Sequence, residues 1–148
     1  MAGKNHIGKS IYLFWDDSGG TARNLTADML PDTLSGPGLV MDEVDMTGQS
    51  QPVKNYLAGQ GRSTITAKFH MNDTSTTGSF TVIKNTVGSV GTLTVQYGQN
   101  GAAPTTGDPE WEGEYVLVAA PVTIEGGRAV LNPVWEVGSA TAPAWGTV

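Results

Sequence analysis

Apolar and polar residues alternate strictly in two stretches of this chain, and that alternation limits the folds open to it. In Thr64–Met71 every second residue from Ile65 onward is apolar. In Thr92–Tyr97 the apolar residues, starting at Leu93, are separated by threonine or glutamine. Side chains on a β-strand point alternately to two faces, so each stretch predicts a strand with one buried and one solvated face. An all-helical fold is excluded.

Further strands are predicted where short apolar or β-branched runs end near glycine or proline. They are Ile11–Asp16, Val40–Asp45, Tyr115–Ala120 and Ala129–Val137. Pro133 places the last of these at an edge or a bulge, because proline has no backbone N–H. One helix is predicted at Thr76–Val87, since Phe80 and Ile83 begin an i, i+3, i+7 apolar series and Gly88 follows as a cap.

The 148 residues fit one domain, residues 1–148. Residues 46–62 are rich in Gly, Gln, Ser, Pro and Asn, which predicts a long irregular loop. Such a loop in a compact domain is a candidate contact surface or a segment that orders on assembly. Residues 1–10 and 140–148 are predicted to be flexible terminal arms, the second carrying Trp145, an aromatic residue expected to pack on the domain or on a neighbour.

The chain offers little for catalysis or metal binding. It has no cysteine and two histidines, His6 and His70, that are far apart in sequence. Gly3–Ser10 matches the phosphate-loop pattern G-x-x-x-x-G-K-S, but a strand-like run rather than a helix follows it. We therefore predict no enzyme activity, no catalytic residue, no metal site and no cofactor. A net charge of −6 disfavours gripping DNA or an anionic membrane.

Acidic residues gather in two places along the sequence. The candidates are Asp42, Glu43 and Asp45 in one place and Glu110, Glu112 and Glu114 in the other. Three carboxylates at alternate positions could supply a glycosidase pair or a calcium site. Such a pattern more commonly marks a solvated face. A more specific interpretation is a surface that repels a polyanion such as DNA.

The segments between Ile11 and Thr147 follow one another in a recognisable order. Leu34–Gly48 reads as a strand leading into a long loop, and Val53–Arg62 as an aromatic-then-glycine exit from that loop. A strand at Ser63–Asn72 comes next, followed by the helix candidate, Thr92–Gly98, Ala129–Trp135 and Ala140–Thr147. This order resembles the major tail (tail tube) proteins of bacteriophages with long non-contractile tails.

The resemblance implies a β-sandwich or barrel with one flanking α-helix. It also implies a structural virion protein that forms hexameric rings, which stack into a tail tube and serve as a conduit for DNA during ejection. The implied partners are further copies of the chain, a tape-measure protein and DNA held in the lumen without sequence-specific binding, and tail-tip and tail-terminator proteins. The implied location is the virion tail, with assembly in the host cytoplasm.

Within this hypothesis, residues 46–62 form a loop that stacks one ring on the next. The residues assigned to that contact are Gln49, Val53, Lys54, Tyr56, Leu57 and Arg62. The six acidic candidates would line the bore or an outer surface. The two terminal arms, with Trp145, are expected to lie on adjacent subunits.

Other classes of protein also fit the sequence. A tail terminator, a head–tail connector or a capsid decoration protein would share the small β architecture, and the tube protein of a contractile injection machine would also stack. A carbohydrate-binding β-sandwich is the alternative that does not assemble. Its candidate sugar platforms are Trp15, Trp111, Trp135 and Trp145.

Overall fold

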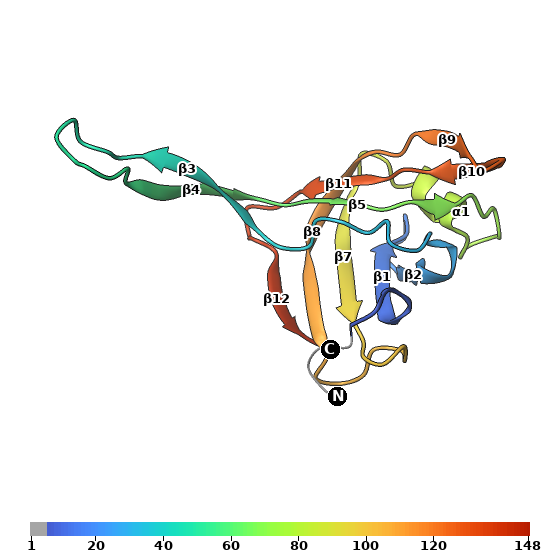
Figure 1. Cartoon of the computed structure of the whole chain (residues 1–148). Coiled ribbons are helices and arrows are strands. Elements are labelled where there is room, and N and C mark those ends of the chain that lie inside the picture. Colours follow the sequence, from blue (N-terminus) through green and yellow to red (C-terminus); the bar gives the residue numbers. More distant parts are fainter. Residues whose placement is uncertain (1–5) are drawn as a thin grey trace.

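The computed structural model describes residues 6–148, which form three antiparallel sheets and one short helix (Figure 1). The main sheet has seven strands in the order β2-β1-β7-β8-β11-β5, with β12 also paired to β8. Its strands are β1 (Ile11–Asp16), β2 (Ala22–Asn24), β5 (Thr64–Thr66), β7 (Val90–Tyr97), β8 (Pro109–Ala119), β11 (Val134–Val137) and β12 (Ala144–Thr147). The predicted mainly β fold is confirmed.

Two smaller sheets, one helix and two turns complete the fold. A three-stranded sheet has the order β6-β10-β9 and consists of β6 (Phe69–His70), β10 (Arg128–Leu131) and β9 (Val122–Glu125). A two-stranded hairpin is formed by β3 (Val40–Asp45) and β4 (Tyr56–Arg62). The helix is α1 (Ser79–Lys84), and 3-10 turns lie at Gly8–Ser10 and Thr26–Asp28.

The core lies against one face of the main sheet, as the alternation of residues predicts. Leu93 and Val95 of β7 and Leu117 of β8 are fully buried there. Val82 and Ile83 of α1 cover this face from the other side, together with side chains of β6 and β10. The indole ring of Trp135 lies 5.7 Å from that of Trp15 and 6.4 Å from the ring of Phe69, measured between centroids.

Two of the three buried tryptophans pair their indole nitrogens with hydroxyl groups, whereas Trp135 Nε1 has no hydrogen-bond partner within the described residues. The Tyr115 hydroxyl accepts a hydrogen bond from Trp111 Nε1 at 2.8 Å and shares another with Ser63 Oγ at 2.8 Å. Trp15 Nε1 donates to Thr86 Oγ1 at 2.9 Å. Because an unpaired buried donor costs about 1–3 kcal/mol, these contacts fix the orientation of the aromatic side chains.

Two predicted strands are each divided in the structure. Thr64–Met71 becomes β5 in the main sheet and β6 in the small sheet, because Lys68 between them bonds through its backbone to residues 30 and 33 instead. Ala129–Val137 becomes β10 and β11, with Pro133 in the break, so that each half joins a different sheet. The register of β11 shifts next to this proline, at Val134 and Trp135, as a bulge would require.

The helix is shorter than predicted. It begins at Ser79 rather than Thr76 and ends at Lys84 rather than Val87. Thr76 has a φ of 71°, outside the helical region, and Thr86 bonds back to Val82 and Ile83 through its hydroxyl group, which fits a turn better than a continued helix.

Two segments predicted to be irregular contain strands. Within residues 46–62, only residues 46–55 are irregular, because Tyr56–Arg62 pairs with β3 as strand β4. Within residues 140–148, Ala144–Thr147 forms β12 and pairs with residues 109–112 of β8. In the predicted N-terminal arm, residues 1–5 lie outside the described residues, and His6 bonds to the backbone of β7 and the residue after it.

Candidate assembly surfaces

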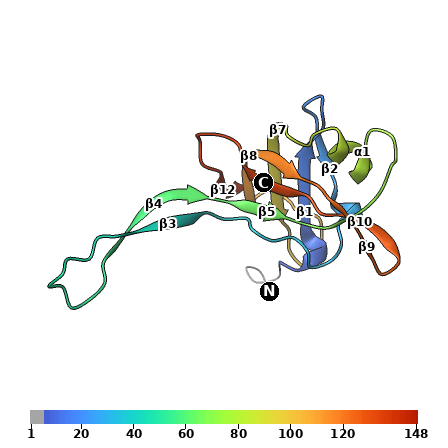
Figure 2. The ribbon, with the colours of Figure 1, turned by 90° about the horizontal axis from the view of Figure 1, so that it is seen from above.

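A β-hairpin projects far from the rest of the molecule. We call residues 39–62, which include β3, β4 and their connecting tip, the arm. Figures 1 and 2 show that the arm points away from the body on the side opposite to α1 and the small sheet. An isolated two-stranded hairpin is marginally stable in water, because it has no buried face. The arm has few buried side chains of its own, which makes it a candidate contact surface.

The exposed apolar side chains of the arm are numerous. They are Leu39, Val40, Met41, Val44, Met46, Val53, Tyr56 and Leu57, with exposed fractions from 43% to 73%. A contiguous apolar patch on a soluble protein marks an interaction site. The arm is thus the strongest candidate for a contact with another protein chain.

The strand register divides the arm into two different faces. Val44 lies opposite Leu57, and these two share a face. Asp45 lies opposite Tyr56, and Glu43 opposite Ala58, on the other face. The carboxylate of Asp42 is 3.8 Å from Arg62 Nε, but both side chains are exposed, so this ion pair adds little stability. We call the side that carries Val44 and Leu57 the aliphatic face.

The base of the arm is anchored to the body through both of its strands. Residue Ser63 joins β4 directly to β5 of the main sheet. In the segment that leads into β3, Ser35 exchanges two backbone hydrogen bonds of 2.9 Å with Thr66 of β5. Gly36 has a φ of +109°, and a Cβ atom there would lie 1.8 Å from the carbonyl oxygen of Thr64. Only glycine fits this position without a clash. The backbone at Gly36 can therefore pass close to β5 on its way from the body into the arm.

The tip of the arm is closed by its own hydrogen bonds. Met46 N donates to Asn55 O at 2.8 Å, and Asn55 N donates to Thr47 Oγ1 at 2.7 Å. Hydrogen bonds from the side chain and backbone of Thr47 hold the pKa of Asp45 below its ordinary value. The tip has a defined shape and presents Val53, with 73% of its surface exposed.

The structure places all the residues predicted for ring stacking on the arm. Gln49, Val53 and Lys54 lie in the tip, and all three are exposed. Tyr56, Leu57 and Arg62 lie on β4, and they are exposed as well. The predicted set contains no residue of β3, although Val40 and Val44 are exposed apolar residues as well. The alternation of apolar and acidic residues in β3 is the signal that could have found them.

A second surface is the solvated face of the main sheet, where glutamates follow one another along β8. Each accepts a hydrogen bond from a residue of β7: Glu110 from Gln96 at 2.8 Å, Glu112 from Thr94 at 3.1 Å and Glu114 from Thr92 at 2.6 Å. On β11, Glu136 accepts from the Thr64 hydroxyl at 2.8 Å. Among residues 6–148, none of these four carboxylates forms an ion pair.

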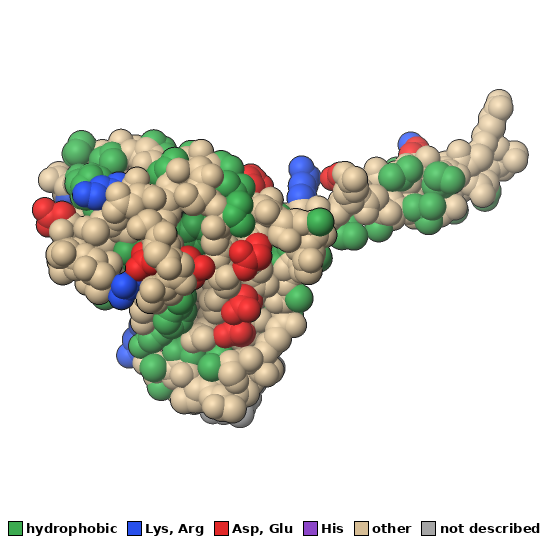
Figure 3. All heavy atoms as spheres, turned by 180° about the vertical axis from the view of Figure 1, so that it is seen from behind, with side chains coloured by type: hydrophobic (Ala, Val, Ile, Leu, Met, Phe, Trp, Pro, Cys, Tyr) green, Lys and Arg blue, Asp and Glu red, His purple; other side chains and the backbone are tan. Residues whose placement is uncertain are grey.

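Figure 3 shows acidic side chains in a column on this side of the molecule. The six acidic candidates do not form one surface, because Asp42, Glu43 and Asp45 lie on the arm and the three glutamates lie on the sheet. The glutamate row has the form of a fixed negative stripe, held in place by neutral donors. Within the described part of the chain, no three acidic, histidine or cysteine side chains are placed to hold a metal ion.

The four tryptophans have different positions. Trp15, Trp111 and Trp135 are at most 1% exposed, so they cannot stack on a sugar. Trp145 is 54% exposed, and its ring packs 5.0 Å from that of Trp111 and 5.7 Å from that of Tyr97. It therefore contacts its own domain and still presents half of its surface.

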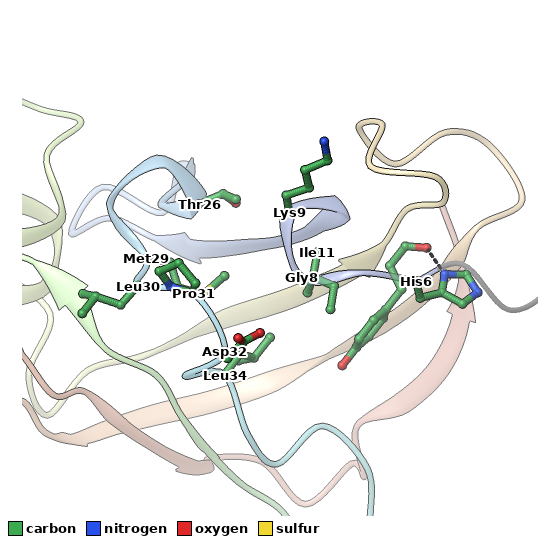
Figure 4. A pocket seen from close by; sticks show the side chains of 11 residues that line it. His6, Gly8, Lys9, Ile11, Thr26, Met29, Leu30, Pro31, Asp32 and Leu34 are labelled. Atoms are coloured by element: carbon green, nitrogen blue, oxygen red, sulfur yellow. Dashed lines mark hydrogen bonds between the residues drawn. The ribbon is translucent and has the colours of Figure 1, made fainter.

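A third feature is a hollow of about 770 Å³ at the end of β1 (Figure 4). Its walls are mostly apolar and come from three segments distant in sequence: Ile11 on β1, the residues from Met29 to Leu34, and Tyr97 at the end of β7. Burial raises the pKa of Tyr97 to about 12, so the phenol stays neutral. Sequence analysis missed this hollow, and the short apolar run Met29-Leu30-Pro31 is the only signal for it.

The phosphate-loop string does not form such a loop in its described part. Gly8–Ser10 is a 3-10 turn, and β1 follows it rather than a helix. Lys9 is exposed at the rim of the hollow. No helix in residues 6–148 has the length and apolar character needed to cross a membrane.

Comparisons with known proteins place the fold. No protein-family model matches the chain, and no curated protein matches it. A chain in the virion of a native gene transfer agent (GTA) particle is 16% identical, with a TM-score of 0.67, over 94% of this chain and 97% of that chain. A chain in the tail of an empty GTA particle, computed with helical refinement and C6 symmetry, is 18% identical with the same TM-score and coverage. The protein shares its fold, over nearly its whole length, with these chains.

Proposed function

We propose that the protein is a structural component of a phage-like tail, which self-assembles into stacked hexameric rings and forms the tube through which DNA passes. The observation that carries this proposal is the likeness over 94% of the chain to a chain from a particle tail with C6 symmetry. The role is not enzymatic. The protein then resides in the virion tail and assembles in the host cytoplasm.

The arm supplies the contact between rings in this proposal. It extends beyond the body, exposes apolar side chains on both faces and has a tip of fixed shape. Covering these side chains releases water from apolar surface and stabilises the stack. Val53, Tyr56 and Leu57 act as apolar anchors, and Gln49, Lys54 and Arg62 supply polar contacts at the edge.

The glutamate row faces the lumen in this proposal. Six copies with a formal charge of −6 carry −36 in each ring. A negative wall repels the phosphate backbone, so DNA slides past it without binding. The hydrogen bonds from β7 hold each glutamate side chain in place without introducing a cation that could hold a phosphate group.

Contacts within a ring are assigned to the two ends of the chain. Trp145 lies on β12 and presents half of its surface for a neighbouring subunit. His6 lies beside the end of β7, near the same part of the body. The remaining partners are a tape-measure protein inside the tube and tail-tip and tail-terminator proteins at its ends.

Negative-stain electron microscopy of the concentrated protein tests the proposal, with light-scattering chromatography on the same sample. Hollow tubes of stacked rings are the expected result. Isolated rings that never stack would indicate a terminator or connector instead. A protein that stays monomeric even when tail-tip components are added would overturn the proposal.

A further inference from the structure

The hollow beside β1 is walled mainly by apolar side chains, and two of its polar side chains, Thr26 and His6, are bonded to the backbone. Pockets for small molecules combine apolar walls with a few converging hydrogen-bonding groups. Here, the Thr26 hydroxyl accepts the backbone N–H of Leu13, and His6 Nδ1 lies 2.9 Å from the carbonyl oxygen of Gly98. Lys9 and Asp32 are exposed. The volume is in the range of about 300–1,000 Å³ that holds a ligand or several side chains.

The aliphatic face of the arm carries exposed apolar side chains that match the apolar wall of the hollow. Val44 and Leu57 lie opposite each other. Gly59 lies beside Val44 and Asp42, so this face is low and is apolar apart from the Asp42 carboxylate. The opposite face carries Glu43 and Asp45. At the arm's base, Leu39 and Met41 already line a groove against residues 137–143 of the same chain. The aliphatic face is therefore the one that lacks a partner.

The arm extends away from the hollow. It continues from β5, the last strand in the sheet order, and leaves the body, whereas the hollow opens between β1 and residues 29–34. Figures 1 and 2 both show the arm and β1 on opposite sides of the body. A chain cannot place its own arm in its own hollow, but a second copy can. Two different patches that meet head to tail generate a repeating assembly.

We propose that the hollow receives the aliphatic face of the arm from a second copy of the chain. This inference rests on the proposed function, and it names the receptor for the arm. Leu57 and Val44 contact the apolar wall formed by Met29, Leu30 and Leu34. Lys9 at the rim, which forms no ion pair within residues 6–148, meets a carboxylate of β3.

Disulfide trapping tests this contact, because the chain has no cysteine of its own. One chain carries Leu57→Cys and a second, larger tagged chain carries Pro31→Cys, an exposed position that lines the hollow. The two are mixed and oxidised, and mixed dimers are measured on a non-reducing gel. In the matched control the tagged chain carries Ile124→Cys, an apolar position on β9 that is 74% exposed and outside the hollow.

Docking raises the effective concentration of the cysteine pair from about 10 micromolar to about 1 millimolar, so we expect roughly 100-fold faster formation of mixed dimers than in the control. Unmodified protein is examined for tubes in parallel. Tubes together with equal trapping rates at Pro31→Cys and Ile124→Cys would overturn this inference and leave the proposed function standing. Selective trapping without tubes would support the arm contact and count against the tube. Absence of both would overturn both.

Discussion

Leu57→Ala should weaken assembly while leaving the monomer as stable as before. The side chain is 55% exposed in the monomer. Full burial of a leucine side chain is worth about 1.5–3 kcal/mol, so covering the exposed half contributes about 1 kcal/mol per subunit. If single subunits join the tube, the critical concentration should rise about fivefold. If preformed rings of six join, the loss is about 6 kcal/mol per ring, which corresponds to roughly 10⁴-fold.

The assay is sedimentation of tubes over a series of protein concentrations, with the unfolding of the monomer followed in urea. Ile124→Ala is the matched control, because this aliphatic side chain is also exposed but lies on β9. Unfolding free energies of both variants should stay within about 0.5 kcal/mol of the parent. If Leu57→Ala sediments at the same concentration as the parent, or if Ile124→Ala is equally impaired, the arm does not carry the contact.

Three further predictions concern the core, the response to acid and the glutamate row. Tyr115→Phe leaves Trp111 Nε1 and Ser63 Oγ without their shared partner, and urea unfolding should show a loss of about 1–3 kcal/mol. Hydrogen bonds from Thr105 hold the pKa of Asp108 below its ordinary value. Their stabilising effect is present above about pH 4 and is lost as the pH falls through the lowered pKa, so Asp108→Asn should flatten the decline in stability measured between about pH 5 and pH 2. Replacing Glu110, Glu112 and Glu114 with Gln changes the net charge from −6 to −3. Tubes of this variant should retain DNA at low salt, as measured by co-sedimentation, whereas unchanged retention would place the row outside the bore.

Most strands with one buried face were predictable from sequence. Of the two arm strands, which are exposed on both faces, β3 was predicted at Val40–Asp45 and β4 was not. Ile11–Asp16 and the alternating residues of β7 have the predicted strand character, because each packs one face on the core. Strand β4 contains two glycines and is solvated on both faces, so its residues show no period of two. Within the monomer, β4 has no buried face that would impose an alternation of apolar and polar residues on its sequence.

One candidate surface could be predicted from the sequence, and the positions of the others follow only from the tertiary structure. The glutamates of β8 share a face because of the period of two, and the sequence alone shows this. That Asp42, Glu43 and Asp45 lie on a separate projection follows only from the path of β3. The hollow could not be predicted, because Ile11, Met29 and Tyr97 meet through a sheet order that no local pattern encodes.

Strand β4 continues almost directly into β5, so a force applied to the arm is transmitted to the main sheet. Ser63 is the single residue between the two strands, and its hydroxyl is tied to Tyr115 in the core. A pull on the arm therefore travels along one extended backbone into the sheet, where the three residue pairs between β5 and β11 resist it in shear. In the proposed tube, a bending load on the arm would enter the main sheet at its β5 edge and pass to β11 through the pairing of these two strands.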